Sequence, residues 1–193
     1  MIKYKVITPP SQEPVTLAEA KNWLKVEHSE DDSLISALIQ ATREAVERYT
    51  GQSLFTAVIE QAYDGFPVSD IHNPFAGFTL AWSPVQSVDS ITYRLETGGE
   101  EMLAADRYTL DNYAKPSQVM PKYNSFWPSA YYHVNSVKIR YTVGRSDVAD
   151  IPEVFKTAIK MTLADYYDKR QDSVRNLPSQ AEWLLDKYRV KWF

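Results

Sequence analysis

The spacing of hydrophobic residues divides the chain into two helical ends and a strand-rich middle. Hydrophobic positions recur about every 3.6 residues over 17–24, 34–49 and 154–167, and a further apolar segment opens at Pro178. Between them, from 54 to 143, hydrophobic and polar positions alternate with a period of two. The pattern predicts the order helix–helix, strands, helix–helix.

Capping residues mark the ends of the first two helices. Thr16 followed by Glu19 is a capping-box pair, which predicts a short helix ending near Val26. The second helix is expected to start at Ser29, with acidic residues in its first turn, and to end at Gly51.

Helix signals return after the strands. Asp150 is expected near the N-cap and Pro152 near the first helical position of the third helix. A last helix is predicted from Pro178-Ser179. Because the strands lie between the two pairs of helices, helices from the two ends of the chain must pack on each other around the inserted sheet.

Turn residues separate the predicted strands. Gly98-Gly99, between two alternating segments, is the strongest hairpin signal. The predicted strands are Leu54–Tyr63, Phe78–Trp82, Ser87–Leu95, Arg107–Asp111, Ser117–Pro121 and Val134–Val143.

These elements predict an α+β fold, in which N- and C-terminal helices form one helical core and a small antiparallel β sub-domain is inserted. Three prolines between Thr8 and Pro14 favour an extended segment there. The expected division is an extended N-terminal arm (1–14), the N-terminal half of the helical core (15–53), the inserted β sub-domain (54–145), the C-terminal half of the helical core (146–176) and a C-terminal segment (177–193).

Composition excludes several classes of protein. The 193 residues include no Cys, which rules out a disulfide framework, a thiolate nucleophile and Cys-based metal sites. No apolar run approaches the roughly 20 residues of a membrane span, and the first residues lack the apolar region of a signal peptide. A soluble protein of a reducing cytosol is expected. The net charge of −4 argues against tight nucleic-acid binding.

The sequence carries no catalytic constellation. His28, His72 and His133 lie in different segments without metal-ligand spacing. The acidic run 30–32 is explained by its place at a helix start. We therefore expect no enzyme activity, no metal and no cofactor.

Aromatic residues are the most distinctive feature. Phe126, Trp127, Tyr131 and Tyr132 fall in one predicted loop, and either core packing or a contact surface would explain them. The chain also ends in aromatic residues, whereas chain ends are usually polar and frayed. This end either folds back onto its own core or inserts into a neighbouring chain.

An ordered set of short motifs runs through almost the whole chain. They are Ile7-Thr8-Pro9-Pro10, Glu13 to Lys21, Leu24-Lys25-Val26, Glu30 to Ile35, Ala41 to Gly51, Asp64-Gly65-Phe66-Pro67, Ser83 to Val88, Ile91-Thr92-Tyr93, Tyr141 to Gly144, Ile151-Pro152-Glu153 and Leu185 to Val190. With them the sequence resembles the bacteriophage head–tail connector (adaptor, head-completion) family. It departs from many relatives by the extra Lys191-Trp192-Phe193.

The resemblance implies a non-enzymatic virion protein of the capsid–tail neck, assembled in the host cytoplasm. Such proteins form a ring, typically of twelve subunits, beneath the portal protein, extend the DNA channel and carry the stopper or other tail proteins. Packaged double-stranded DNA would pass without sequence-specific binding, and no membrane is involved. The portal-contacting residues implied by position are Trp183, Leu184, Tyr188, Arg189, Trp192 and Phe193. A subunit or tail interface is expected at Phe126, Trp127, Tyr131 and Tyr132.

A second function class fits the aromatic loop. The β sub-domain would then bind carbohydrate or peptide, and hydrolysis would need two carboxylates within about 5–10 Å in a cleft lined by these aromatics.

Overall fold

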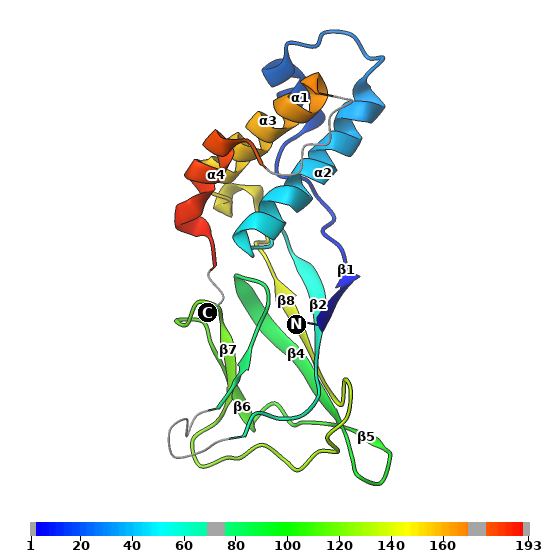
Figure 1. Cartoon of the computed structure of the whole chain (residues 1–193), viewed down its shortest axis with the longest axis vertical. Helices are drawn as coiled ribbons and strands as arrows, with labels where there is room; N and C mark the ends of the chain where they lie inside the picture. The colour runs from blue at the N-terminus through cyan, green and yellow to red at the C-terminus, as the bar shows by residue number, and fades with distance from the viewer. Residues whose placement is uncertain (1–2, 69–75, 170–176, 191–193) are drawn as a thin grey trace. The chain divides into compact units, whose positions relative to one another are not determined.

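The computed structural model describes residues 3–68, 76–169 and 177–190 (Figure 1). Contacts divide the chain into two compact units. A helical unit contains residues 10–55 and 145–190, and a sheet unit contains residues 3–9 and 56–144 within the described ranges. Each unit therefore combines segments that are distant in the sequence.

The helical unit is built from four α-helices and two short 3-10 helices within the described residues. They are α1 (Leu17–Leu24), α2 (Asp32–Thr50), the 3-10 helix Val148–Asp150, α3 (Glu153–Asp168), α4 (Ser179–Leu185) and the 3-10 helix Asp186–Tyr188. All four α-helices lie at or near their predicted positions.

Local capping sets the limits of α1 and α2. The Thr16 hydroxyl accepts a hydrogen bond from the Glu19 backbone N–H at 3.2 Å, and the Glu19 carboxylate accepts from the Thr16 N–H at 2.8 Å, which confirms the capping box. Gly51, with φ of 68°, ends α2 and donates its N–H to the Glu47 carbonyl at 2.8 Å. The start of α2 was predicted three residues early, because Ser29 and Asp32 are joined by a separate turn.

One hydrophobic core joins helices from both ends of the chain. Its fully buried side chains include Ile35 and Val46 of α2, and Phe155 and Leu163 of α3. Leu185 of α4 is buried in the same cluster. In Figure 1 the blue α1 and the orange α3 run beside each other within this unit, and contacts between them agree. The predicted α+β fold with a helical core shared by the two chain ends is confirmed.

A buried ion-pair network crosses this core. The guanidinium of Arg43, whose side chain is 6% exposed, lies 2.6 Å from the Glu47 carboxylate and 2.8 Å from that of Glu13. The second oxygen of Glu47 accepts the Leu54 backbone N–H at 2.7 Å. Burial raises the pKa of Glu47, while Arg43 and the Leu54 N–H counteract the rise. Glu47 thereby links α2 to the segment that leaves it.

The sheet unit contains two antiparallel sheets. The five-stranded sheet has the order β1 (Lys3–Thr8), β2 (Ala57–Tyr63), β8 (Val137–Val143), β4 (Val85–Arg94), β5 (Glu100–Met102). The three-stranded sheet has the order β3 (Phe78–Thr79), β7 (Gln118–Pro121), β6 (Tyr108–Asp111).

Alternate residues of β2 and β8 supply much of the core of the sheet unit. Ile59 and Tyr141 face each other in register and are both buried. Gln61 adds a buried polar link, because its side chain accepts from the Ala81 N–H at 2.8 Å and donates to the Thr79 carbonyl at 3.1 Å. The Tyr141 hydroxyl donates to the same Gln61 oxygen, and burial raises the pKa of Tyr141 far above its ordinary range. Tyr141 therefore stays a neutral donor that helps to hold Gln61 in place.

The predicted strands are all present, most of them shorter than expected. The hairpin at Gly98-Gly99 is confirmed, because it connects β4 to β5 and Gly98 has a φ of 94°. β5 and β1 were not among the predicted strands, and β1 takes up part of the expected extended arm. Its six residues are exposed or only partly buried, so they give no hydrophobic alternation that the sequence could reveal.

A charged row fastens β1 to the sheet. The Glu60 carboxylate lies 2.8 Å from Lys5 on β1 and 2.9 Å from Arg140 on β8. Burial alone would raise the pKa of Glu60, but the hydrogen bonds from Lys5 and Arg140 outweigh it and hold the pKa below the ordinary 4.5. The charged form of Glu60 is thus the one that the fold favours.

Replacing Glu47 by Ala is expected to destabilise the helical unit by about 3–5 kcal/mol, because it leaves the buried Arg43 short of a partner and the Leu54 N–H without an acceptor. Urea unfolding followed by helical circular dichroism measures the change. Glu44→Gln is the control, since Glu44 lies 3.7 Å from Arg43 and is half exposed. Its effect should stay within about 1 kcal/mol. Equal losses in both variants would contradict the role of Glu47.

Stability of the sheet unit should fall as the pH drops below about 4.5, because a carboxylate with a lowered folded-state pKa stabilises the fold only while it is charged. The Glu60 contribution is present in full above that value and is lost as the pH falls through the lower folded-state pKa. Urea unfolding at about pH 7 and pH 3.5 tests this. Glu60→Gln should flatten some of the dependence, whereas Glu96→Gln in the exposed hairpin turn should leave it unchanged.

Candidate interaction surfaces

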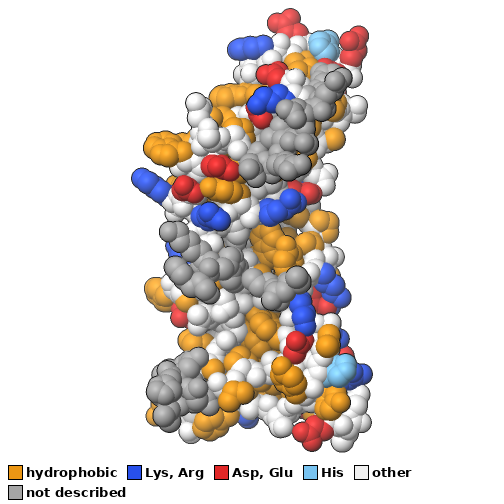
Figure 2. All heavy atoms as spheres, in the orientation of Figure 1, with side chains coloured by type: hydrophobic (Ala, Val, Ile, Leu, Met, Phe, Trp, Pro, Cys, Tyr) orange, Lys and Arg blue, Asp and Glu red, His pale blue; other side chains and the backbone are white. Residues whose placement is uncertain are grey.

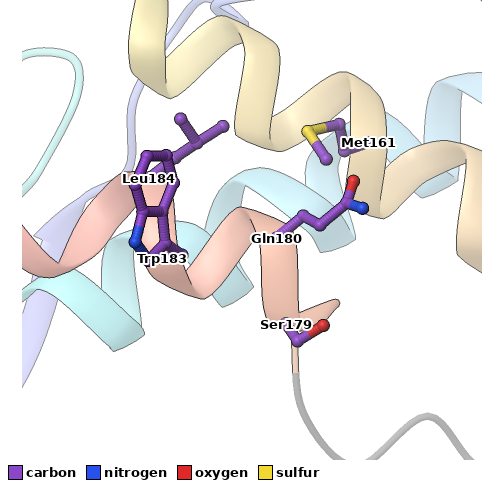
Figure 3. Close-up of a pocket in the computed structure, with 5 residues that line it drawn as sticks. All are labelled: Met161, Ser179, Gln180, Trp183 and Leu184. Atoms are coloured by element: carbon purple, nitrogen blue, oxygen red, sulfur yellow. The ribbon is translucent and has the colours of Figure 1, made fainter.

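A shallow hollow of about 330 Å³ lies on the helical unit between α3 and α4. Met161 of α3 and Ser179, Gln180, Trp183 and Leu184 of α4 line it (Figure 3). In Figure 3 the Met161 and Gln180 side chains approach each other, while Trp183 and Leu184 stand together farther along α4. Trp183 is 75% exposed. This is a mostly apolar surface that another chain could cover.

α4 has the spacing that produces this surface. Ala181 and Leu185, four residues apart, are buried against the helical core. Trp183, between them in sequence, must point away from that core. Residues 177–190 therefore pack on their own core, whereas Trp192 and Phe193 at the aromatic chain end, for which the sequence left two alternatives, lie outside the described residues.

The other predicted portal residues have intramolecular contacts. The ring of Tyr188 packs edge-on against Phe155 at 5.1 Å, and the Arg189 guanidinium lies 5.1 Å from the centre of the Tyr49 ring. Gln52 donates a hydrogen bond to the Tyr188 carbonyl. Tyr188 and Arg189 thus hold the end of the described segment against α2 and α3.

Trp183 and Leu184 are brought together at the hollow, apart from that anchoring pair. Trp192 and Phe193 lie outside the described residues. Met161 and Gln180 were missed by sequence reasoning. Met161 sits beside the apolar stripe of α3 and gave no signal that separates a surface methionine from a core one.

The aromatic loop of the sheet unit divides into core and surface residues. Trp127 stacks on Phe66 at 5.3 Å, and its indole N–H donates to the Ala76 carbonyl at 2.9 Å. Trp127 is therefore a partly buried residue that packs against the sheet core. Phe126 and Tyr132 are 76% and 80% exposed.

Tyr131, also exposed, stacks on His133 at 5.7 Å. Together with Phe126 and Tyr132 it leaves three aromatic side chains of the loop accessible. Figure 2 shows hydrophobic side chains spread over the visible face of the sheet unit, with charged ones between them. A subunit or tail interface at these three residues therefore stays a hypothesis.

Side chains of the same chain contact the acidic residues at the start of α2. The Tyr167 hydroxyl donates to Asp31, and Lys21 lies 2.5 Å from Asp32. Of the histidines, His28 is 3.9 Å from Glu30, and His72 lies outside the described residues. No cluster of three metal-ligating side chains occurs in the described portion of the chain. Nor does any described helix have the length and hydrophobicity needed to span a bilayer.

The carbohydrate- or peptide-binding alternative loses one of its aromatic residues. A sugar-binding platform needs an accessible ring face, whereas one face of Trp127 is covered by Phe66 and its N–H is already bonded.

Residues 14–92 match the family model of phage gp6-like head-tail connector proteins. The matched region begins before α1 and ends within β4, so it includes the capping box, the buried Arg43–Glu47 pair and the entry into the sheet unit. The resemblance to head–tail connector proteins is confirmed. No curated protein matches the chain significantly in sequence.

Several solved structures share the fold over almost the entire chain. A chain from the virion of a native gene transfer agent (GTA) particle is 18% identical, has a TM-score of 0.76 and is matched over 98% of this chain and 96% of its own. A chain from the neck of an empty GTA particle, computed with C6 symmetry, is 17% identical with a TM-score of 0.77, over 99% and 97%. A chain from the neck of a native GTA particle, computed with C12 symmetry, is 20% identical with a TM-score of 0.74, over 100% and 97%.

Trp127→Ala should destabilise the sheet unit by about 3 kcal/mol, because it removes the stacking on Phe66 and the bond to Ala76. The neighbouring Phe126→Ala should change the free energy of unfolding by no more than about 0.5 kcal/mol. Urea unfolding followed by near-ultraviolet circular dichroism compares the two. A large loss for Phe126→Ala would show that its side chain is packed rather than exposed.

Proposed function

We propose that this chain, which its residues 14–92 relate to the phage gp6-like head–tail connector proteins, is a structural protein of a virion neck. It forms a homo-oligomeric ring under the capsid portal, extends the DNA channel and carries the stopper or another tail protein. The proposed role is structural and involves no enzyme activity and no cofactor.

The family match is the observation that carries this proposal. It covers α1, α2 and the first strands of the sheet unit after β1, so both units contribute to it. The fold likeness to chains from GTA particle structures extends the comparison to α3 and α4. A common fold over this length supports a common architectural role.

Twelve subunits are the ring size we propose. One structurally similar chain comes from a neck computed with C12 symmetry, which supports this number. In such a ring each subunit presents two different faces to its two neighbours, and the rotation between subunits closes the circle.

The hollow between α3 and α4 is the proposed portal contact. Trp183 is largely exposed beside Leu184, and exposed tryptophans that fill a partner's pocket dominate many interfaces. We propose that Trp192 and Phe193 continue this contact. Tyr188 and Arg189 position the segment through Phe155 and Tyr49, and their contact with the portal remains part of the proposal.

The proposed DNA passage requires no base recognition. The net charge of −4 does not favour tight binding to a phosphate backbone, as suits a conduit. Assembly in the host cytoplasm and residence in the virion neck complete the proposal. The exposed Phe126, Tyr131 and Tyr132 are the proposed contacts with a neighbouring subunit or the tail.

Purified chain mixed with its cognate portal should form a complex of one discrete stoichiometry, which native mass spectrometry measures against the 22.1 kDa monomer. Trp183→Ala should weaken portal binding by about tenfold or more, the loss typical of a central interface tryptophan. Deleting only residues 191–193 tests the proposed extension. Deleting the whole segment from 183 would not, because Leu185 is buried in the helical core.

Trp23→Ala is the matched control, since Trp23 is also a partly exposed tryptophan of the helical unit, on α1. It should leave portal binding within about threefold of the unmodified chain. Failure of the unmodified chain to bind the portal would contradict the proposed function. Equal losses for Trp23→Ala and Trp183→Ala would contradict the assignment of the contact.

A further inference from the structure

The five-stranded sheet ends in two edges of opposite charge. β1 forms one edge and β5 the other, and no strand of the described residues pairs with their outer sides. β1 carries Lys3 and Lys5, whereas β5 begins with Glu100 and Glu101. Unpaired edges offer rows of backbone donors and acceptors to another chain.

Apolar side chains accompany both edges. Tyr4 and Val6 on β1 are 47% and 50% exposed, and Met102 on β5 is 65% exposed. A strand added at either edge would cover some of this surface.

We propose that the β1 edge of one copy of this chain pairs with the β5 edge of the next copy. The inference rests on the proposed ring, because only a head-to-tail contact uses both edges of every subunit. This contact between the sheet units of neighbouring copies, called the seam below, is separate from the hollow on the helical unit.

Charge selects this pairing over its alternatives. Two β1 edges would bring lysines together, and two β5 edges would bring glutamates together, so both symmetric pairings are repulsive. Pairing β1 with β5 places Lys3 and Lys5 on the same sheet face as Glu100, whereas Glu101 lies on the opposite face. The edges thereby favour the heterologous contact and disfavour closed dimers.

The existing ion pairs are compatible with this seam. Lys5 is 65% exposed although it contacts Glu60, and Glu100 is 59% exposed although it contacts Lys138. Each can gain a second partner without being left buried and unpaired. The strand pairings across the sheet place Lys3 of β1 and Met102 of β5 on the same face of the sheet. Lys5 and Glu60 lie on one face in the same way.

Strand number determines the direction of the seam. All neighbours in the five-stranded sheet are antiparallel, and an odd number of such strands leaves β1 and β5 running the same way. A small rotation between neighbours in a ring preserves that direction. The seam is therefore a parallel pairing over the length of the short β5.

Designed cysteines test the seam directly, because the chain has none of its own. Lys3 and Met102 lie in one cross-strand row of the sheet, so in the double variant Lys3→Cys/Met102→Cys parallel pairing brings the two cysteines of neighbouring copies together. Mild oxidation of the full chain should then give a ladder of dimers, trimers and larger species on a non-reducing gel. Within one copy the two positions lie at opposite sheet edges, about 19 Å apart across four strand spacings. An intramolecular disulfide, which needs Cα atoms within about 7 Å, cannot form.

Three controls accompany the ladder. Each single cysteine variant should give dimers at most. Lys3→Cys/Asp106→Cys, with the second cysteine in the exposed turn after β5, should give no ladder. Thermal unfolding of the reduced variants confirms that they are folded.

Charge reversal provides an independent readout. Lys3→Glu, which leaves the Lys5–Glu60 pair intact, should lower ring formation by about tenfold relative to the unmodified chain, and adding Glu100→Lys to the same chain should restore most of it. Restoration is a result that simple misfolding of the first variant would not give.

The outcomes separate this inference from the proposed function. A discrete ring with the portal but no cysteine ladder would overturn the seam and leave the connector function standing. A ladder without a ring or portal binding would support the seam and contradict the connector function. Failure of Glu100→Lys to restore ring formation in the Lys3→Glu variant would also count against the seam.

Discussion

Contact between α2 and α3 holds the helical unit together, although residues 56–144, most of the sheet unit, lie between the two helices in the sequence. Ile35 and Val46 from the first half and Phe155 and Leu163 from the second half are buried in one cluster. The apolar faces of these helices are buried against each other, as packed layers around one core require. The hollow that α3 and α4 form depends on this closure, since Met161 comes from one helix and Trp183 from the other.

Within each unit, polar groups are used where hydrophobic packing alone would not specify position. Glu47 receives hydrogen bonds from Arg43 and from the backbone of Leu54. Gln61 connects β2 to the backbone near β3 in the same way. Such fully satisfied buried groups fix the register of the elements they join. The sheet edges proposed for assembly are held in a similar way, by the ion pairs Lys5–Glu60 and Lys138–Glu100.

Sequence reasoning succeeded where a signal is local. The Thr16–Glu19 capping box, the end of α2 at Gly51 and the Gly98-Gly99 hairpin each depend on residues close in the chain, and each is found as predicted. β1 was missed because both of its faces are largely exposed and its stability comes from pairing with β2, more than fifty residues away. Trp127 could not be assigned to core or surface because its partners, Phe66 and Ala76, lie in a different loop.

The predicted portal set shows the same limit. Its six residues were carried over by position from the family resemblance, without regard to side-chain direction; on α4 that direction exposes Trp183 and buries Leu185, which lies outside the set. Tyr188 and Arg189 find partners in Phe155 and Tyr49 that no local pattern indicates. Helical geometry could have suggested the first distinction, whereas the second required the tertiary structure.

The chain leaves and re-enters the helical unit at almost one point. Phe55 and Arg145 form a parallel bridge, and the Arg145 N–H donates to the Leu54 carbonyl at 3.3 Å. Residues 56–144 therefore behave as a cassette whose two ends meet, so that its gain, loss or exchange would require only a short splice beside the helical core. Such an arrangement lets the sheet unit diverge to suit different neighbours while the helices keep their packing.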